Sequence, residues 1–127
     1  MTISMLKLLK NTQTIGSWGE NIARAFLIKH GYKIIGQNER LGHKEIDLIA
    51  LYGPETVFIE VKTRLAGSLG LAEEQINHQK IKKLKSALCA YCVNHKILFA
   101  TARLDLIAIN VNKDKKMAKI RHFKNIF

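Results

Sequence analysis

Two alternating segments on either side of a four-residue turn constrain the fold of this chain more than any other feature. Lys44–Ala50 alternates charged and apolar side chains, and Thr56–Lys62 carries apolar side chains at every second position. This is the period of a β-strand. Gly and Pro occur side by side in the intervening Tyr52–Glu55 and favour a tight turn. We therefore expect an antiparallel β-hairpin at this point.

Two longer segments show the spacing of α-helices. Apolar residues recur at intervals of about 3.6 residues in Ser17–His30, and an apolar stripe runs between lysines in Ile76–Val93. Three further segments are rich in β-prone residues, namely Tyr32–Gln37, Leu104–Val111 and Met117–Phe123. This order of elements predicts a single domain over residues 1–127 with an α/β (α+β) fold, in which helices flank a central mixed β-sheet.

The hairpin brings charged groups of two strands together. Glu45 and Asp47 share one face of their strand, and Glu60 and Lys62 share one face of the next, because strand side chains repeat every two residues. A two-residue or a four-residue loop both place Asp47 opposite Glu60, with Cβ atoms about 4.5–5.5 Å apart. Carboxylates at that distance repel each other unless a proton or a cation lies between them. The pairing therefore predicts a site for a hard divalent ion.

The charge of the chain indicates the class of substrate. The 127 residues carry 21 Lys and Arg against 10 Asp and Glu, a formal net charge of +11. Residues 76–127 hold twelve of these basic side chains and only two of the acidic ones. This excess favours anionic partners, above all nucleic-acid phosphates. Because Mg²⁺ keeps room for a phosphate oxygen and a water molecule, with the Lys62 ammonium beside them, we expect hydrolysis of a phosphodiester bond.

Several short motifs occur in order along the chain. They are G-x-x-G-E-x-x-A (16–23), G-Y (31–32), N-x-R (38–40), E-I-D-L-I-A (45–50), V-F-I-E-V-K-T-R (57–64), the helix around Gln79 and Lys80, R-L-D-L-I-A-I (103–109) and K-N-I-F (124–127). Through this set the chain resembles the YraN family of small bacterial proteins. The resemblance implies the restriction-endonuclease-like fold of the PD-(D/E)xK superfamily, similar to archaeal Holliday junction resolvases.

The resemblance also implies roles for individual residues. Asp47 and Glu60 would bind the metal ion, with help from the Val61 carbonyl, and Glu20 on the first helix would complete the metal site. Lys62 would be the catalytic lysine, which orients the nucleophile or stabilises charge. The implied reaction is in-line attack of a metal-activated water, with Mg²⁺ or Mn²⁺ as the cofactor and these three carboxylates and the lysine as the catalytic residues.

Basic residues near this site are candidates for binding nucleic acid. Those that we expect to contact phosphates are Lys80, Lys82, Lys83 and Arg64. A solvated helix face is the alternative interpretation of the three lysines. The basic run in residues 113–124 is typical of a solvated hairpin. Lys44 stands where the family usually has Gly, which adds charge and bulk beside the E-I-D motif.

Other interpretations of the same residues stay open. An exposed strand face with a cross-strand charge pair would also explain Asp47, Glu60 and Lys62. Glu20 would then be a solvated acid near the start of a helix, and Glu45 would cap its strand or pair with a basic neighbour.

Cys89 and Cys92 form a C-x-x-C pair, which occurs in zinc and redox sites. The pair falls late in a helical segment and no second C-x-x-C follows it. This favours buried or half-buried thiols over zinc.

The leading prediction is a metal-dependent nuclease, a Mg²⁺-dependent endodeoxyribonuclease with branched DNA as a candidate substrate. The alternative is a nucleic-acid-binding module that keeps the fold without significant catalysis, because related proteins share folds more readily than functions. A small basic protein of a ribonucleoprotein is a third class, which leaves the pairing of Asp47 with Glu60 unexplained. A homodimer would suit a junction, in which two symmetric strands are cut.

The sequence also predicts where the protein resides. Its longest uninterrupted apolar run, Ala87–Val93, is far shorter than the roughly 18 residues of a membrane span. The first residues lack the apolar core of a signal peptide. We expect a cytoplasmic protein with no membrane partner.

Overall fold

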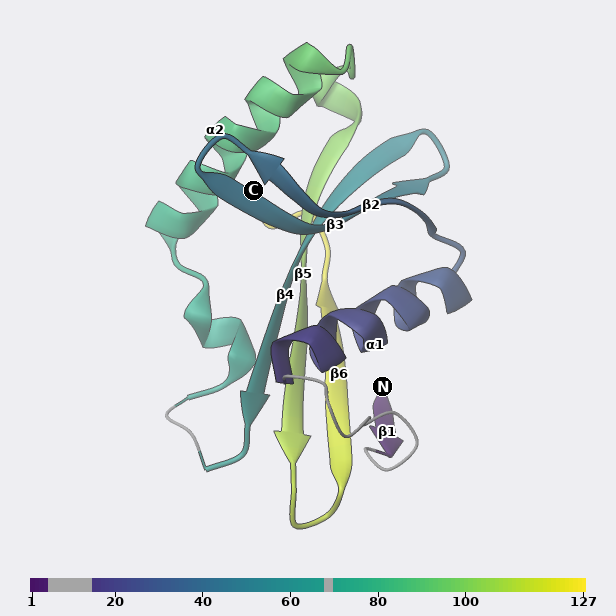
Figure 1. The fold of residues 1–127 in the computed structure, drawn as a ribbon, viewed down its shortest axis with the longest axis vertical. Coiled ribbons are helices and arrows are strands. Elements are labelled where there is room, and N and C mark those ends of the chain that lie inside the picture. Colours follow the sequence, from purple (N-terminus) through teal and green to yellow (C-terminus); the bar gives the residue numbers. More distant parts are fainter. Residues whose placement is uncertain (5–14, 68–69) are drawn as a thin grey trace.

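The computed structural model describes residues 1–4, 15–67 and 70–127. Within these residues, six strands form one mixed sheet in the order β1-β6-β5-β4-β3-β2 (Figure 1). Strands β4 and β5 are parallel, and the other neighbouring strands are antiparallel. In chain order the elements are β1 (Thr2–Ser4), α1 (Ile15–Lys29), β2 (Lys33–Leu41), β3 (Lys44–Tyr52), β4 (Glu55–Leu65), η2 (Ala72–Gln75), α2 (His78–Asn94), η3 (Phe99–Thr101), β5 (Ala102–Asn112) and β6 (Met117–Phe123).

The structure confirms the hairpin and the fold class that the sequence predicts. Strands β3 and β4 pair in antiparallel register, with Tyr52 opposite Glu55 and Leu51 opposite Thr56. Gly53 at the turn has a φ of 56°, a left-handed conformation that glycine adopts without steric cost. The mixed sheet with helices packed on it is the α+β arrangement expected from the order of the elements.

Helix α2 begins later than the apolar stripe suggests. The stripe predicts a start at Ile76, but the helix begins at His78 because Asn77 caps it. The Asn77 side chain accepts a hydrogen bond of 3.0 Å from the Lys80 backbone N–H, which satisfies one of the free donors of the first turn. In the described part of the chain, no helix is both long and apolar enough to cross a membrane.

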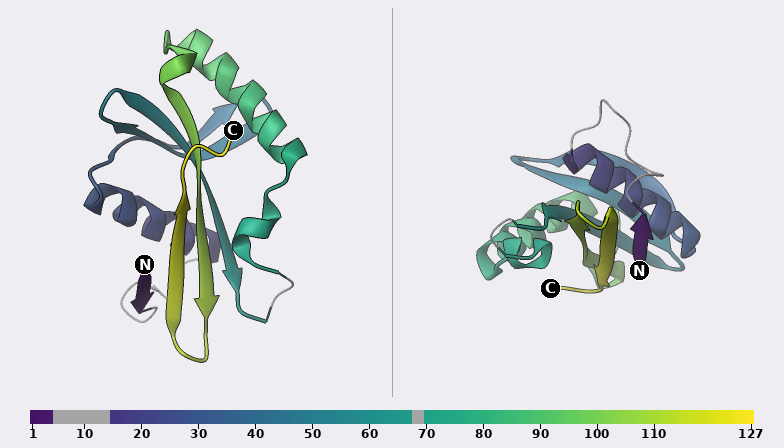
Figure 2. Two further views of the ribbon diagram at one scale, coloured as in Figure 1. Left: turned by 180° about the vertical axis from the view of Figure 1, so that it is seen from behind. Right: turned by 90° about the horizontal axis from the view of Figure 1, so that it is seen from below.

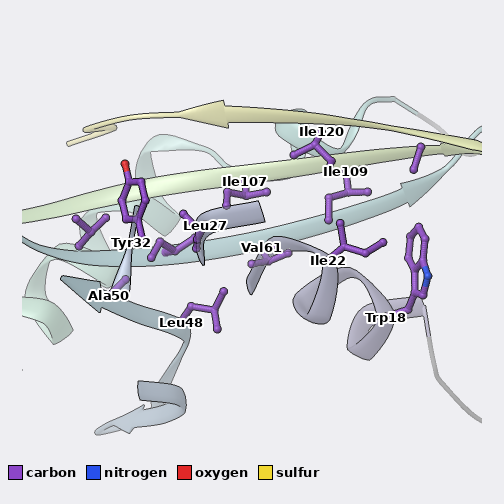
Figure 3. Close-up of a cluster of buried hydrophobic side chains, with 14 of the residues drawn as sticks. Trp18, Ile22, Leu27, Tyr32, Leu48, Ala50, Val61, Ile107, Ile109 and Ile120 are labelled. Atoms are coloured by element: carbon purple, nitrogen blue, oxygen red, sulfur yellow. The ribbon is translucent and has the colours of Figure 1, made fainter. Parts of the chain in front are cut away.

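Two buried clusters lie on opposite faces of the sheet. Val57 and Ile59 of β4 belong to the cluster under α1, whereas Phe58 between them belongs to the cluster under α2. The views in Figure 2 show the two helices on different sides of the strands. The residues of the α1 cluster labelled in Figure 3 are Trp18, Ile22, Leu27, Tyr32, Leu48, Ala50, Val61, Ile107, Ile109 and Ile120. Packing on both faces therefore fixes β3 and β4, the strands that carry Asp47 and Glu60.

Helix α1 approaches β4 closely at Gly19. A Cβ atom on Gly19 would collide with the Thr63 hydroxyl and lie 3.1 Å from the Thr63 Cβ. We therefore expect Gly19→Ala to lower the free energy of unfolding by about 1–3 kcal/mol through overpacking, as measured by urea denaturation. Gly16→Ala in the same helix is the matched control, because a Cβ there meets nothing within 4 Å. It should raise stability by up to about 1 kcal/mol through helix propensity; equal effects of the two substitutions would contradict the close approach.

Candidate active site

Asp47 lies where the pairing between β3 and β4 ends. The paired residues run from Tyr52 and Glu55 to Leu48 and Ile59, and the next step in this register places Asp47 opposite Glu60. At that step the Asp47 Oδ2 atom accepts a hydrogen bond of 2.7 Å from the Val61 backbone N–H. The side chain therefore satisfies a donor of the neighbouring strand, which holds the Asp47 carboxylate against β4.

Glu60 is a buried carboxyl group beside this carboxylate. Only 9% of the residue is exposed. Burial, a hydrogen bond with the Asp47 side chain and repulsion by its charge raise the pKa of Glu60 to about 8, against an opposite effect of Lys62. The Lys62 Nζ atom lies 3.7 Å from the Glu60 Oε1 atom. The pair thus favours a bound proton or cation over two free negative charges.

Glu20 approaches the pair from helix α1. Burial first, and then repulsion by Asp47, raise the pKa of Glu20; a hydrogen bond from Asn38 lowers it, and the Glu45 charge raises it further. Glu20 therefore lies within electrostatic reach of Asp47. However, no group of three or more His, Cys, Asp or Glu residues in the described ranges has an arrangement that could hold a metal ion. The three carboxylates predicted as metal ligands are thus neighbours rather than a ready three-ligand set.

A pocket of about 230 Å³ opens beside Glu60, between the strands and the start of α2. Three lysines supply positive charge to its wall, and Ile76 and Leu84 form an apolar part. Its lining residues are Lys44, Glu45, Glu60, Lys62, Ile76, Lys80 and Leu84. Lys44 therefore lies in the wall of the pocket, a position that the sequence did not predict.

One of the four residues predicted to contact nucleic acid lines this pocket. Lys80 lines it and its Nζ atom donates a hydrogen bond of 2.8 Å to the Gln75 carbonyl. Lys82 and Lys83 are exposed on α2 and do not line it. Arg64 is half-buried on β4, and its Nε atom is buried with no hydrogen-bond partner among the described residues.

Neither cysteine lines the pocket beside Glu60. Cys92 packs in the cluster under α2 and Cys89 is half-buried, and both are free thiols. Burial raises the pKa of the Cys92 thiol, so its uncharged form is favoured. This agrees with the interpretation of the pair as buried or half-buried thiols.

The donor chemistry of the site fits a hard divalent ion. Mg²⁺ is commonly held by one or two carboxylates and keeps several waters, so it does not require a cage of protein ligands. Asp47 and Glu60 supply two carboxylates whose mutual repulsion a cation would relieve. The half-buried Lys62 side chain adds its own positive charge beside Glu60.

Comparisons with known proteins show which family this chain is similar to. A model of the uncharacterised protein family UPF0102 matches residues 19–109. A UPF0102 protein of Caldanaerobacter subterraneus is 38% identical over 118 residues, which cover 92% of this chain and 97% of that protein. One of Caldicellulosiruptor bescii is 39% identical over 121 residues, which cover 92% of this chain and 99% of that protein. One of Syntrophomonas wolfei is 36% identical over 113 residues, with coverage of 89% and 96%.

Proposed function

This chain belongs to the uncharacterised protein family UPF0102, the YraN family, and from that premise we propose that it is a metal-dependent nuclease acting on DNA. The observation that carries the proposal is the pairing of Asp47 with the buried Glu60, whose pKa is raised to about 8, next to Lys62. Such perturbed groups in a pocket are typical of catalytic sites. The proposed reaction is hydrolysis of a phosphodiester bond.

Each residue has a distinct part in this reaction. Asp47 and Glu60 would hold Mg²⁺ or Mn²⁺, with Glu20 as a further carboxylate, and the bound ion would supply Lewis acidity and a more acidic water. The Lys62 ammonium would orient the attacking water and stabilise negative charge on the phosphoryl oxygens. The water oxygen would form a bond to phosphorus as the opposite phosphorus–oxygen bond breaks. The attacking water would lose a proton to solvent, and the leaving oxygen would take up a proton from solvent.

The basic residues would hold the DNA backbone against this site. Lys80 is placed at the pocket, and Lys82, Lys83 and Arg64 would contact phosphates farther along the strand. Branched DNA is the substrate class that we favour, and a homodimer would cut its two symmetric strands.

A specific observation favours a second candidate function. Because the described carboxylates form no ready three-ligand group, a nucleic-acid-binding module without significant turnover is the alternative. It would keep salt-sensitive binding through the same lysines but need no metal ion.

Cleavage of defined DNA substrates separates the two functions. Plasmid, linear and four-way-junction DNA would be incubated with the wild-type protein in Mg²⁺, in Mn²⁺ and in EDTA. The nuclease predicts products that require the metal, with the junction cut fastest. The binding module predicts salt-sensitive DNA binding with no metal-dependent product, even at high protein concentration. That result would exclude the nuclease.

A further inference from the structure

A second pocket lies along helix α2 and is called the Tyr91 pocket here. Its volume of about 370 Å³ falls in the range of roughly 300–1,000 Å³ that small-molecule sites occupy. Its polar and aromatic lining residues are Arg40, Ser86, Tyr91, Asn94 and His95. None of the described residues that line it is acidic, whereas two glutamates line the pocket beside Glu60. An anionic ligand would therefore meet no negative side chain in the wall of the Tyr91 pocket.

The two pockets are neighbours along the same helix and the same turn of the sheet. Leu41 of the Tyr91 pocket pairs with Lys44, which lines the pocket beside Glu60. Figure 1 shows this turn between β2 and β3 beside α2. On the helix, Leu84 lines the first pocket and Tyr91 the second, about two helical turns or about 10 Å farther along the axis. Each strand of B-form DNA has one phosphate per about 3.4 Å of axis, so about three nucleotides span this distance.

The aromatic wall of the Tyr91 pocket is a stacked pair of rings. The centroids of the Tyr91 and His95 rings lie 3.8 Å apart, with an angle of 16° between the rings. The His95 Nδ1 atom lies 3.0 Å from the Tyr91 carbonyl oxygen, which can only accept, so Nδ1 carries a proton and donates. Tyr91 in turn contacts the buried Phe58 ring edge to face, at 5.4 Å between centroids. The exposed His95 ring is thus a flat surface that is held in place from below.

The groups that meet in this pocket are those that bind a nucleotide of a single strand. An aromatic ring stacks on any base, and a guanidinium binds a phosphate through parallel N–H donors. A side-chain amide both donates and accepts at a base edge. Arg40 comes from β2, whereas His95 and Asn94 come from the end of α2. The fold therefore brings a phosphate-binding group of one element to a stacking surface of another.

We propose that the Tyr91 pocket binds one nucleotide of the DNA strand that occupies the pocket beside Glu60, with its base stacked on His95 and its phosphate at Arg40. This inference rests on the proposed function, because it assumes that DNA enters the pocket beside Glu60. A nucleotide held about three positions away fixes which phosphate lies at the carboxylates. The pocket also favours DNA with unpaired nucleotides, since a base that is already unpaired stacks on a ring without the cost of leaving a duplex.

Binding of a short fluorescein-labelled oligothymidine, measured by fluorescence anisotropy in EDTA, tests the inference without cleavage. His95→Ala should weaken binding by about fivefold or more, the lower end of the cost of losing one stacked base. His95→Phe keeps a ring and should bind as the wild type does. His30→Ala is the matched control, because the His30 ring also lies on an aromatic ring, with 4.2 Å between its centroid and that of Phe26, and its Nδ1 atom lies 2.7 Å from the Phe26 carbonyl oxygen. His30 lines neither pocket, so its removal should leave binding unchanged.

The salt dependence of binding tests the part of Arg40. Arg40→Ala should weaken binding and reduce the slope of log K against log salt concentration by about 0.7, the effect of one phosphate contact on a single strand. His95→Ala should leave this slope unchanged. Arg24→Ala removes the same charge from an exposed position of α1, which packs on the other face of the sheet. It should keep both the affinity and the slope of the wild type.

An abasic strand of the same length separates base stacking from charge, because His95→Ala should bind it as tightly as the wild type does. Wild-type affinity of His95→Ala for oligothymidine, or an equal loss on the abasic strand, would overturn the stacking. Binding of free thymidine monophosphate as tight as that of the strand would assign the pocket to a free nucleotide and overturn the proposal. If the wild type binds DNA and both His95→Ala and Arg40→Ala bind it equally well, only the role of the Tyr91 pocket is lost. A wild type that binds no DNA would overturn the proposed function as well.

Discussion

Lys62→Ala should reduce the rate of metal-dependent DNA cleavage by about a hundredfold or more, which is the usual cost of removing one group that stabilises charge in the transition state. The Lys62 side chain is half-buried in the pocket wall with its Nζ atom 3.7 Å from the Glu60 Oε1 atom. Its charge is therefore held where the phosphate would lie. Single-turnover cleavage at saturating Mn²⁺ measures the effect on the chemical step.

Two comparisons make this result specific. Lys33→Ala removes the same charge from an exposed position at the start of β2, where Lys33 pairs with Leu51. This variant should cleave DNA at the wild-type rate. Asp47→Asn should lose cleavage together with Mn²⁺ affinity, whereas Lys62→Ala should keep its Mn²⁺ affinity because an ammonium group is not a metal ligand. Equal cleavage by the wild type, Asp47→Asn and Lys62→Ala would exclude the nuclease.

The centre of this site was predictable because one hairpin determines it. Alternation fixed the faces of β3 and β4, and the short turn at Gly53 left no freedom in the register, so Asp47 had to approach Glu60. Each of these steps depends on local sequence. The predicted segment Met117–Phe123 agrees with β6 for the same reason, since apolar side chains at alternate positions face the core.

The surroundings of the hairpin were not predictable in this way. Strand β2 extends to Leu41 rather than ending at Gln37, because Asn38 interrupts its regular conformation without ending its pairing. The sequence shows only a polar stretch there. Strand β1 has three residues and η2 has four, which is too short for a periodic pattern.

A buried network of charges at β5 was also invisible in the sequence. Asp105 is 0% exposed. Its carboxylate accepts two hydrogen bonds of 2.9 Å from the Arg103 guanidinium, one of 2.9 Å from the Asn125 backbone N–H and one of 2.7 Å from the His122 ring. Arg103 also donates to the Tyr32 hydroxyl, 71 positions away in the chain. A buried charge such as the Asp105 carboxylate is stable in the interior only while its ion-pair and hydrogen-bond partners are present.

Asp105→Asn should therefore lower the free energy of unfolding by about 3–5 kcal/mol, the usual cost of removing one partner from a buried ion pair. The amide that replaces the carboxylate leaves the buried Arg103 charge with the more exposed Glu55, 2.9 Å from its guanidinium, as its remaining ion-pair partner. It also cannot accept the same four hydrogen bonds. Urea denaturation at neutral pH measures the loss. Asp114→Asn makes the same chemical change on the exposed turn before β6 and should alter stability by less than about 0.5 kcal/mol.

The pH dependence of unfolding distinguishes a lost charge from poor packing of the new amide. Burial alone would raise the pKa of Asp105. The pKa nevertheless lies below its ordinary value, because the carboxylate accepts hydrogen bonds from His122, Arg103 and Asn125 and lies beside the Arg103 charge. In the unfolded chain this carboxyl has an ordinary pKa of about 3.9, so the unfolded chain binds more protons than the folded chain at acid pH. The stability that the Asp105 charge contributes therefore falls as pH decreases. It is fully present above the unfolded pKa and is lost as pH passes through the lower folded pKa. The difference in stability between the wild type and Asp105→Asn should accordingly shrink below pH about 4; a difference that stays constant down to acid unfolding would assign the loss to packing instead.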